Sequence, residues 1–152
     1  MQLNKLTADD VALFDEASRL LAERHHAELH QVAAAVRGAS GAVYTGLHLG
    51  SRRINVCAES SALAQAVIAG EETVVAAVAV CMDAAGTAPQ VTNPCGVCRE
   101  LMGEYAPDAT IIVDAGGSVA AVRLRELLPL PWLRAEEGET PPHPTAGTAS
   151  DA

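Results

Sequence analysis

The chain has 152 residues, of which 49% are hydrophobic, and a formal net charge of −9. A chain of this length and composition can bury one hydrophobic core, and no segment is long and apolar enough to span a bilayer or to act as a signal peptide. The acidic balance disfavours a nucleic-acid substrate, because tight DNA or RNA binding is supported by basic patches and the longest basic run is Arg52-Arg53.

The first predicted element is a helix that begins after Thr7. The segment Thr7-Ala8-Asp9-Asp10 resembles a capping box in which Asp replaces the usual Glu, and apolar residues follow at helical spacing at Val11, Phe14, Ala17 and Leu21. We expect this helix to be structural. Two strand-forming runs follow it, at 30–37 and 42–49, and the glycines and serine between them predict a hairpin.

A second helix is predicted from about 56 to 69, with Asn55 as its N-cap and Gly70 after its end. Its start carries Cys57-Ala58-Glu59, which puts Cys57 in the first turn and Glu59 about half a turn further on. The apolar run at 74–82 is typical of a strand buried on both faces.

A third helix is predicted after Asn93-Pro94 and ends before Pro107, so Cys95 and Cys98 fall in its first turn. Residues three apart share a helix face, so both sulfurs can reach one metal ion. The N-termini of two helices then converge on that ion, and their positive ends favour thiolate over thiol.

Strands at 110–113 and 118–122 and a short helix at 123–128 complete the predicted elements. The order predicts an α/β fold, a three-layer α-β-α sandwich with a mixed five-stranded sheet. Residues 1–134 are predicted to form a single domain. Residues 135–152, rich in Pro, Gly, Thr, Ala and acid, are predicted to form a disordered tail.

The three cysteines Cys57, Cys95 and Cys98 predict a catalytic zinc site with one Zn²⁺ per chain. Three protein ligands leave the fourth tetrahedral position for water, whereas a structural zinc is normally closed by four Cys or His ligands. Glu59, two positions beyond Cys57, points away from the ligand face towards the open position. We therefore expect Glu59 to be the general acid and base that carries protons during the reaction.

Three alternatives remain for these residues. The Cys-x-x-Cys pair could be a redox motif, although it opens a helix and has a distant Cys-x-Glu companion. The zinc could be structural, with Cys81 or a His as fourth ligand, although Cys81 follows an apolar run where an inert buried thiol is expected. The chain could also keep the fold and the cysteines without catalysing a reaction, although the presence of Glu59 argues against this. With three of four cysteines on metal, no even disulfide framework is left, so we expect a cytoplasmic protein.

These motifs resemble the small zinc-dependent cytidine deaminases, a homotetrameric family that includes blasticidin-S deaminase. The resemblance covers residues 30–129 and rests on Cys-Ala-Glu, on Pro-Cys-Gly-x-Cys-Arg and on a late Arg-Glu-Leu-Leu-Pro at 125–129. It implies hydrolytic deamination of cytidine- or deoxycytidine-type nucleosides to the uridine-type product and ammonia, in nucleoside metabolism such as pyrimidine salvage. It also implies a small-molecule nucleoside substrate, a homotetramer, and neither nucleic acid nor membrane as partner. A nucleoside antibiotic or modified base as substrate, and a non-catalytic zinc-stabilised scaffold, are the alternatives.

The substrate pocket departs from the family pattern. Where typical members have a stacking Phe-Pro and a ribose-binding Asn-x-Glu, this chain has His30-Gln31 and His48-Leu49-Gly50. His30, His48 and Ala58 are the predicted substrate contacts, with solvent-facing or interface positions as the alternative for the two histidines. Because Gly50 replaces the acid, we expect a pocket that is open on the sugar side and binds cytidine poorly. Gly50→Glu should then improve cytidine binding if the backbone tolerates a side chain.

Arg99 is the remaining site candidate. Zinc with three thiolates is a net monoanion, and the family usually offsets this charge with arginines hydrogen-bonded to the sulfurs. Ser60 stands where cytidine deaminases usually carry one of these arginines, whereas Arg99 directly follows Cys98. We expect Arg99 to support the sulfurs, with a surface salt bridge to Glu104 as the alternative.

Overall fold

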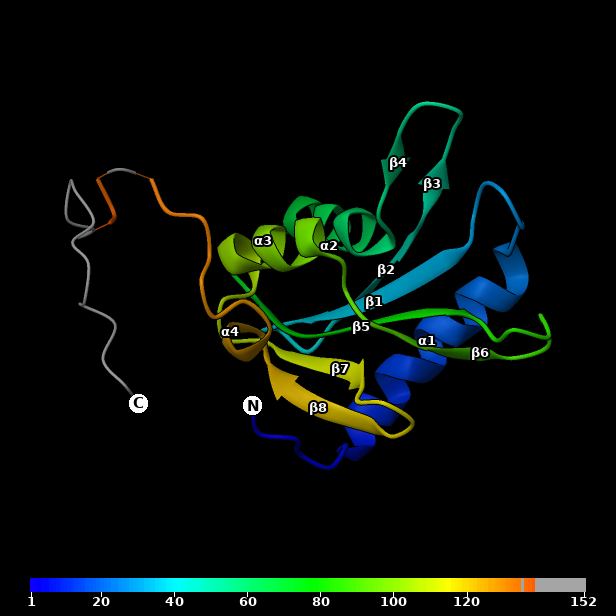
Figure 1. Cartoon of the computed structure of the whole chain (residues 1–152), viewed down its shortest axis with the longest axis horizontal. Helices are drawn as coiled ribbons and strands as arrows, with labels where there is room; N and C mark the ends of the chain where they lie inside the picture. Colours follow the sequence, from blue (N-terminus) through cyan, green and yellow to red (C-terminus); the bar gives the residue numbers. More distant parts are fainter. Residues whose placement is uncertain (135, 139–152) are drawn as a thin grey trace, which may run out of the picture.

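One mixed β-sheet with helices on both faces carries the fold (Figure 1). The computed structural model describes residues 1–134 and 136–138, so the predicted tail at 135–152 lies, apart from 136–138, outside the described residues. The helices are α1 (Ala8–Arg24), α2 (Ala58–Ile68), α3 (Gly96–Tyr105) and α4 (Leu124–Leu127). The strands are β1 (Val32–Gly38), β2 (Val43–Leu47), β3 (Leu49–Gly50), β4 (Asn55–Val56), β5 (Val74–Met82), β6 (Pro89–Thr92), β7 (Thr110–Asp114) and β8 (Val119–Arg123).

The sheet has the strand order β2-β1-β5-β7-β8. The pair β5–β7 is parallel and the other pairs along this path are antiparallel, which confirms the predicted mixed sheet. Within the described residues the sheet has a sixth strand, which corrects the predicted number of five. This strand, β6, lies antiparallel to the second half of β5. Its four residues begin with a proline, which is a weak signal for a strand, so the sequence did not reveal it.

The two faces of the sheet are covered by different helices, as the three-layer prediction required. On one face α1 packs Leu13, Ala17 and Leu21 against the sheet, and on the other α2 and α3 cover it with residues such as Leu63 and Met102. Alternate residues of β1 point to the two cores, and most of them are alanines. Small side chains allow both helical layers to lie close to the strand. None of the helices described here is long and apolar enough to cross a bilayer.

The first helix has the predicted capping box but a different buried stripe. The Thr7 hydroxyl accepts from the backbone N–H of Asp10, and the Asp10 carboxylate accepts from the backbone N–H of Thr7 at 2.9 Å. Asp10, buried at 3% exposure, also lies 3.7 Å from Arg37. The buried stripe runs through Leu13, whereas Val11, one of the apolar residues at helical spacing, is 47% exposed. The capping carboxylate of Asp10 lies on the buried face of the helix, and Val11 faces outward.

Candidate active site

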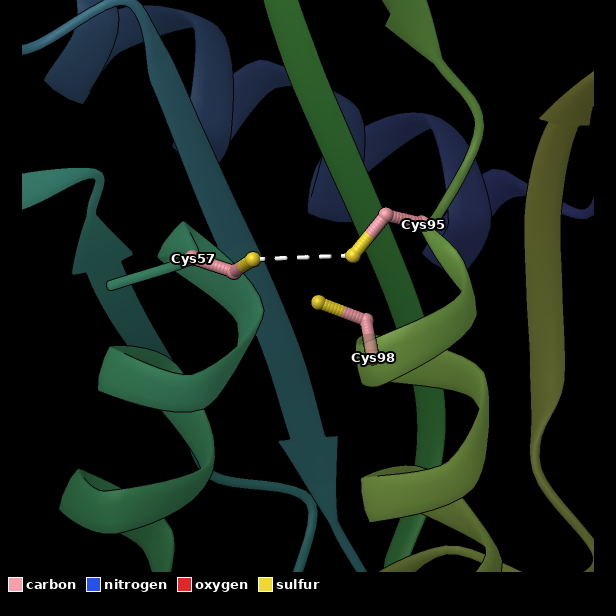
Figure 2. A group of neighbouring side chains, drawn as sticks. All are labelled: Cys57, Cys95 and Cys98. Atoms are coloured by element: carbon pink, nitrogen blue, oxygen red, sulfur yellow. Dashed lines mark hydrogen bonds between the residues drawn. The ribbon is translucent and has the colours of Figure 1, made fainter. Parts of the chain in front are cut away.

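The helices α2 and α3 begin side by side, and the three predicted ligands lie at these two starts (Figure 2). Cys57 is the N-cap of α2, Cys95 is the N-cap of α3, and Cys98 is the third residue of α3. This corrects the predicted helix boundaries by two residues at α2 and by one or two at α3. Asn55 and Val56 belong to β4 and not to the helix.

The two asparagines predicted as N-caps have other partners. Asn93 bridges to the end of β7, where its side chain donates to the Asp114 carbonyl and accepts from the Asp114 N–H, both at 2.9 Å. Asn55 lies 2.8 Å from the His48 ring. These amides therefore fix the segments that lead into the helices, and the cysteines themselves take the extended N-cap conformation.

The three sulfurs lie within 4.8 Å of one another, and those of Cys57 and Cys95 are 3.6 Å apart. Figure 2 shows all three pointing into the space between the helix starts. Tetrahedral zinc with Zn–S bonds of about 2.3 Å separates its sulfurs by about 3.8 Å, so the donor set fits this ion. Among the described residues this is the one group of three or more Cys, His, Asp or Glu side chains that could hold a metal ion.

Cys81 is not part of this group, so the alternative of a zinc closed by Cys81 is wrong. Its sulfur lies at the end of β5, 4.0 Å from the Gln90 amide nitrogen. The site therefore keeps three thiol donors, which is the arrangement that leaves a position free for water.

The thiols differ in how readily they ionise. Burial raises the pKa of Cys57, and it raises that of Cys98 strongly. The pKa of Cys95 is lowered although burial opposes ionisation, because the Cys98 backbone N–H and the two neighbouring thiols donate to its sulfur. A bound cation would offset the burial of the other two sulfurs and favour their thiolate forms.

A cavity of about 130 Å³ opens beside the sulfurs. Glu59 lines it and is only 6% exposed, and no described group donates a hydrogen bond to its carboxylate. The Glu59 carboxylate also lies outside the group of ligand atoms, as expected for a carboxylate that carries protons. The complete lining consists of Val32, His48, Cys57, Ala58, Glu59, Thr92, Asn93 and Cys95.

Two of the three predicted substrate contacts line the cavity, and the third does not. Ala58 and His48 line the cavity. His30 is not among the described residues that line it, and its Nδ1 atom lies 2.9 Å from the His48 carbonyl. Val32, Thr92 and Asn93 line the cavity without having been predicted as site residues. Thr92 directly precedes the Asn-Pro-Cys motif, which could have indicated it, whereas nothing in the sequence distinguishes Val32 from other strand residues.

Arg99 contacts the backbone around the site. Its Nε atom donates to the Pro94 carbonyl at 2.9 Å and its Nη1 atom to the Leu127 carbonyl at 3.0 Å. Among the described residues it forms neither a salt bridge with Glu104 nor a hydrogen bond to a sulfur. Arg99 therefore ties the turn before Cys95 to the end of α4.

Two glycines of the β2–β3 region allow unusually close packing. A Cβ atom on Gly46 would lie 2.2 Å from the Ala62 nitrogen and 2.3 Å from the Ala58 carbonyl oxygen, so α2 rests directly on β2. A Cβ atom on Gly50 would lie 2.8 Å from the Glu28 carbonyl oxygen and 3.1 Å from His48 Cε1. The backbone of 28–29 therefore occupies the space beside Gly50, and the condition on which Gly50→Glu would restore a sugar-binding acid is not met.

The comparisons with known proteins agree with this geometry. Residues 8–114 match the family model for the "Cytidine and deoxycytidylate deaminase zinc-binding region". Blasticidin-S deaminase of Bacillus cereus is 30% identical over 139 residues, which cover 88% of this chain and 99% of that protein. A cytidine deaminase of Halalkalibacterium halodurans is 35% identical over 103 residues, which cover 65% of this chain and 74% of that protein.

Solved structures show the same fold. The cytidine deaminase from Burkholderia pseudomallei has a TM-score of 0.66 and 27% identity, over 84% of this chain and 100% of that chain. The cytidine deaminase from Mycobacterium tuberculosis has a TM-score of 0.67 and, at 24% identity, supports the fold alone, over 84% of this chain and 100% of that chain.

The fold, the three-thiol centre and these similarities define a zinc-dependent hydrolase that acts on C–N bonds of cyclic amidines. The chain belongs to the cytidine and deoxycytidylate deaminase family.

Proposed function

We propose that this protein deaminates a cytosine-type ring in a free nucleoside or nucleoside-like molecule, of the cytidine or deoxycytidine type, to the uridine-type product and ammonia. The observation that carries the proposal is the position of Glu59, which faces the same small cavity as the three-thiol centre. A buried carboxylate without a protein hydrogen bond beside such a centre is suited to move protons during hydrolysis.

Cys57, Cys95 and Cys98 would hold the zinc ion, which when bound supplies acidification of a water molecule. The Glu59 carboxylate would accept a first proton as water adds to C4 of the ring and would deliver it to N3. It would then accept the second proton, from the hydroxyl formed on C4, and deliver it to the exocyclic amine. The bond between C4 and the exocyclic nitrogen breaks, ammonia leaves, and C4 becomes the carbonyl carbon of the product. Ala58 would lie against the ring, and Arg99 would support the metal site through the turn before Cys95.

A nucleoside antibiotic is the second candidate substrate. The similarity to blasticidin-S deaminase extends over nearly the whole of that protein, which favours this candidate. A panel of cytidine, deoxycytidine, cytosine, blasticidin S and guanine, followed by absorbance change and ammonia release, would separate the candidates. A protein that releases no ammonia from any cytosine-ring compound would contradict the proposal and favour a scaffold.

Glu59→Gln tests the proposed catalytic role directly. The variant should fold, keep about one zinc per chain and lose at least about a hundredfold in kcat, the lower end of what general acid–base catalysis contributes. Zinc analysis and ammonia release measure the two properties separately. Near-normal turnover would assign the proton transfer to another group.

We further propose that the enzyme is a cytoplasmic homotetramer. The α2–α3 surface exposes several large apolar side chains, including Ile68 at 81% and Val97 at 70% exposure. An apolar helical surface of this kind is typical of contact between copies of a chain. Light scattering would give the mass of the assembly, and a fully active monomer would contradict the proposal.

A further inference from the structure

His48 is hydrogen-bonded on both sides of its ring, although it lines the cavity. Its Nδ1 atom lies 3.2 Å from the Gln31 backbone nitrogen and its Nε2 atom lies 2.8 Å from Asn55 Oδ1. A backbone N–H is always a donor, so Nδ1 accepts from Gln31. A neutral ring then carries its proton on Nε2, which donates to Asn55. Both ring nitrogens are therefore used by the protein.

The two partners of His48 belong to different segments around the cavity. Gln31 lies in the connection between α1 and β1, and Asn55 lies in β4, directly before Val56 and Cys57. The main chain of His48 is bonded one residue beyond Gln31, because its N–H donates to the carbonyl of Val32, the first residue of β1, at 2.8 Å. We call this arrangement of Gln31, His48 and Asn55 the histidine bracket.

Gly50 provides the space for the bracket. The Gly50 N–H donates to the Leu29 carbonyl at 2.8 Å, and a side chain at Gly50 would contact both the Glu28 carbonyl and the His48 ring. The connection before β1 can therefore lie against β3 only because residue 50 has no Cβ atom. Of these residues His48 alone lines the cavity, so its imidazole forms the wall on this side, and Gln31, Asn55 and Gly50 hold that ring in place.

The catalytic segment is held by other contacts. The close approach of Gly46 fixes α2 on β2, and the Ser61 hydroxyl donates to the Leu47 carbonyl at 3.0 Å. Cys57 and Glu59 are therefore also anchored through α2, by contacts that do not involve the bracket. The segments that depend on the bracket are the β3–β4 hairpin, which projects beyond the sheet beside the start of α2 (Figure 1), and the connection at 27–31.

The cavity is too small for a whole nucleoside, so part of the substrate must lie outside it, beside residues such as His48. Its volume of about 130 Å³ is below the 300 Å³ or more that is typical of sites for larger ligands, so it has room for only part of a nucleoside-like molecule. The rest of a nucleoside-like molecule must leave it past the lining residues, of which His48 is one.

We propose that His48 is a positioning residue, which through Asn55 and Gln31 sets the wall against which the part of the substrate beyond the ring lies. The inference rests on the proposed deamination. His48 then determines affinity and not the chemical step, and it acts without giving a ring nitrogen to the substrate. Binding on this side depends on the shape of the wall more than on a charged hydrogen bond, so sugar-modified nucleosides of the same ring are accepted.

The test compares His48→Ala, Asn55→Ala and the double variant with the parent enzyme, and His25→Ala is the matched control on an exposed histidine. KM for the best nucleoside of the panel should rise about tenfold in each bracket variant, as expected when a hydrogen bond that fixes the wall is lost, while kcat and zinc content stay within about threefold. The double variant should be no worse than either single variant, because both remove the same contact. Asn55→Asp retains an oxygen acceptor and should restore KM to within about threefold.

Unchanged KM in His48→Ala, additive losses, or a fall in kcat at constant KM would each overturn the inference. Calorimetric binding of the same nucleosides to the Glu59→Gln protein, with and without Asn55→Ala, gives a readout that needs no turnover. Lack of deamination by the parent enzyme refutes the proposed function alone, whereas equal affinity with and without Asn55→Ala refutes the role of the bracket. Nitrogen-15 spectra of the histidine rings should show His48 protonated on Nε2, and a change at that nitrogen in Asn55→Ala; another tautomer would also overturn the assignment.

Discussion

Gly46→Ala tests whether the contact of α2 with β2 positions the proposed catalytic residues. The added Cβ atom would lie 2.2 Å from the backbone nitrogen of Ala62, whereas ordinary contacts begin at 3.4 Å. This nitrogen and the nearby Ala58 carbonyl oxygen are both backbone atoms, which cannot rotate out of the way as a flexible side chain could. The helix α2 must therefore move away from the sheet by about 1 Å. Overpacking of this kind costs about 1–3 kcal/mol of unfolding free energy.

The displacement matters for activity because α2 begins at Cys57 and carries Glu59 in its first turn. A misplacement of about 1 Å at catalytic groups can cost about a hundredfold in rate. We expect Gly46→Ala to lower kcat by about that factor and to bind zinc more weakly. Urea unfolding, zinc analysis and ammonia release would measure the three effects.

Gly103→Ala is the matched control. A Cβ atom on Gly103 meets no atom within 4 Å, and the residue lies within α3. Alanine is favoured over glycine in a helix by about 0.5–1 kcal/mol, so this variant should be slightly more stable and fully active. If Gly46→Ala were as stable and active as the parent, the close packing of α2 on β2 would not be what positions the site.

Three further predictions concern other parts of the molecule. Alanine at Cys57, Cys95 or Cys98 should abolish binding of the one zinc per chain, whereas Cys81→Ala should retain it. Elemental analysis that finds full zinc in a variant of the first group, or no zinc in Cys81→Ala, would contradict this prediction. Gly50→Glu should raise KM for cytidine or unfold the region, because its side chain meets the backbone of Glu28, and a lower KM in steady-state assays would contradict this packing. Glu71→Gln should lower the free energy of unfolding at neutral pH. Hydrogen bonds to the Glu71 carboxylate, of which the one from the Ser40 hydroxyl has the greatest effect, lower its pKa below the ordinary value of 4.5 and so stabilise the folded protein. That contribution is present above pH 4.5 and is lost as pH falls through the lowered pKa, so the Tm difference between the two proteins should vanish in acid; a difference that persists there would refute it.

The elements that the sequence predicted well are those whose signal is local. The apolar run at 74–82 became β5 with the same bounds, and the Thr7–Asp10 capping box opens α1 as predicted. The side-chain periodicity of a strand and the hydrogen bonds of an N-cap depend on residues that are neighbours in the chain. The same holds for the spacing of Cys95 and Cys98, which placed two sulfurs on one helix start.

The helix starts at the metal centre show the limit of local signals. Asn55 and Asn93 have the right residue type for an N-cap, but each is bonded elsewhere, to His48 and to the Asp114 backbone. Which partner an asparagine takes is decided by segments that are distant in the sequence. The helices therefore begin at the cysteines, one or two residues later than predicted.

The reaction class and the proposed site residues of this protein could be inferred from its sequence alone, because three cysteines and one glutamate at these spacings suit few sites other than a zinc-dependent deaminase. The shape of the substrate side was decided only by the tertiary structure. The sequence suggested an open pocket at Gly50, whereas the fold places the backbone of 28–29 and the His48 ring there. Residue type specifies which atoms are available for chemistry, but the space around them depends on how segments from different parts of the chain pack together.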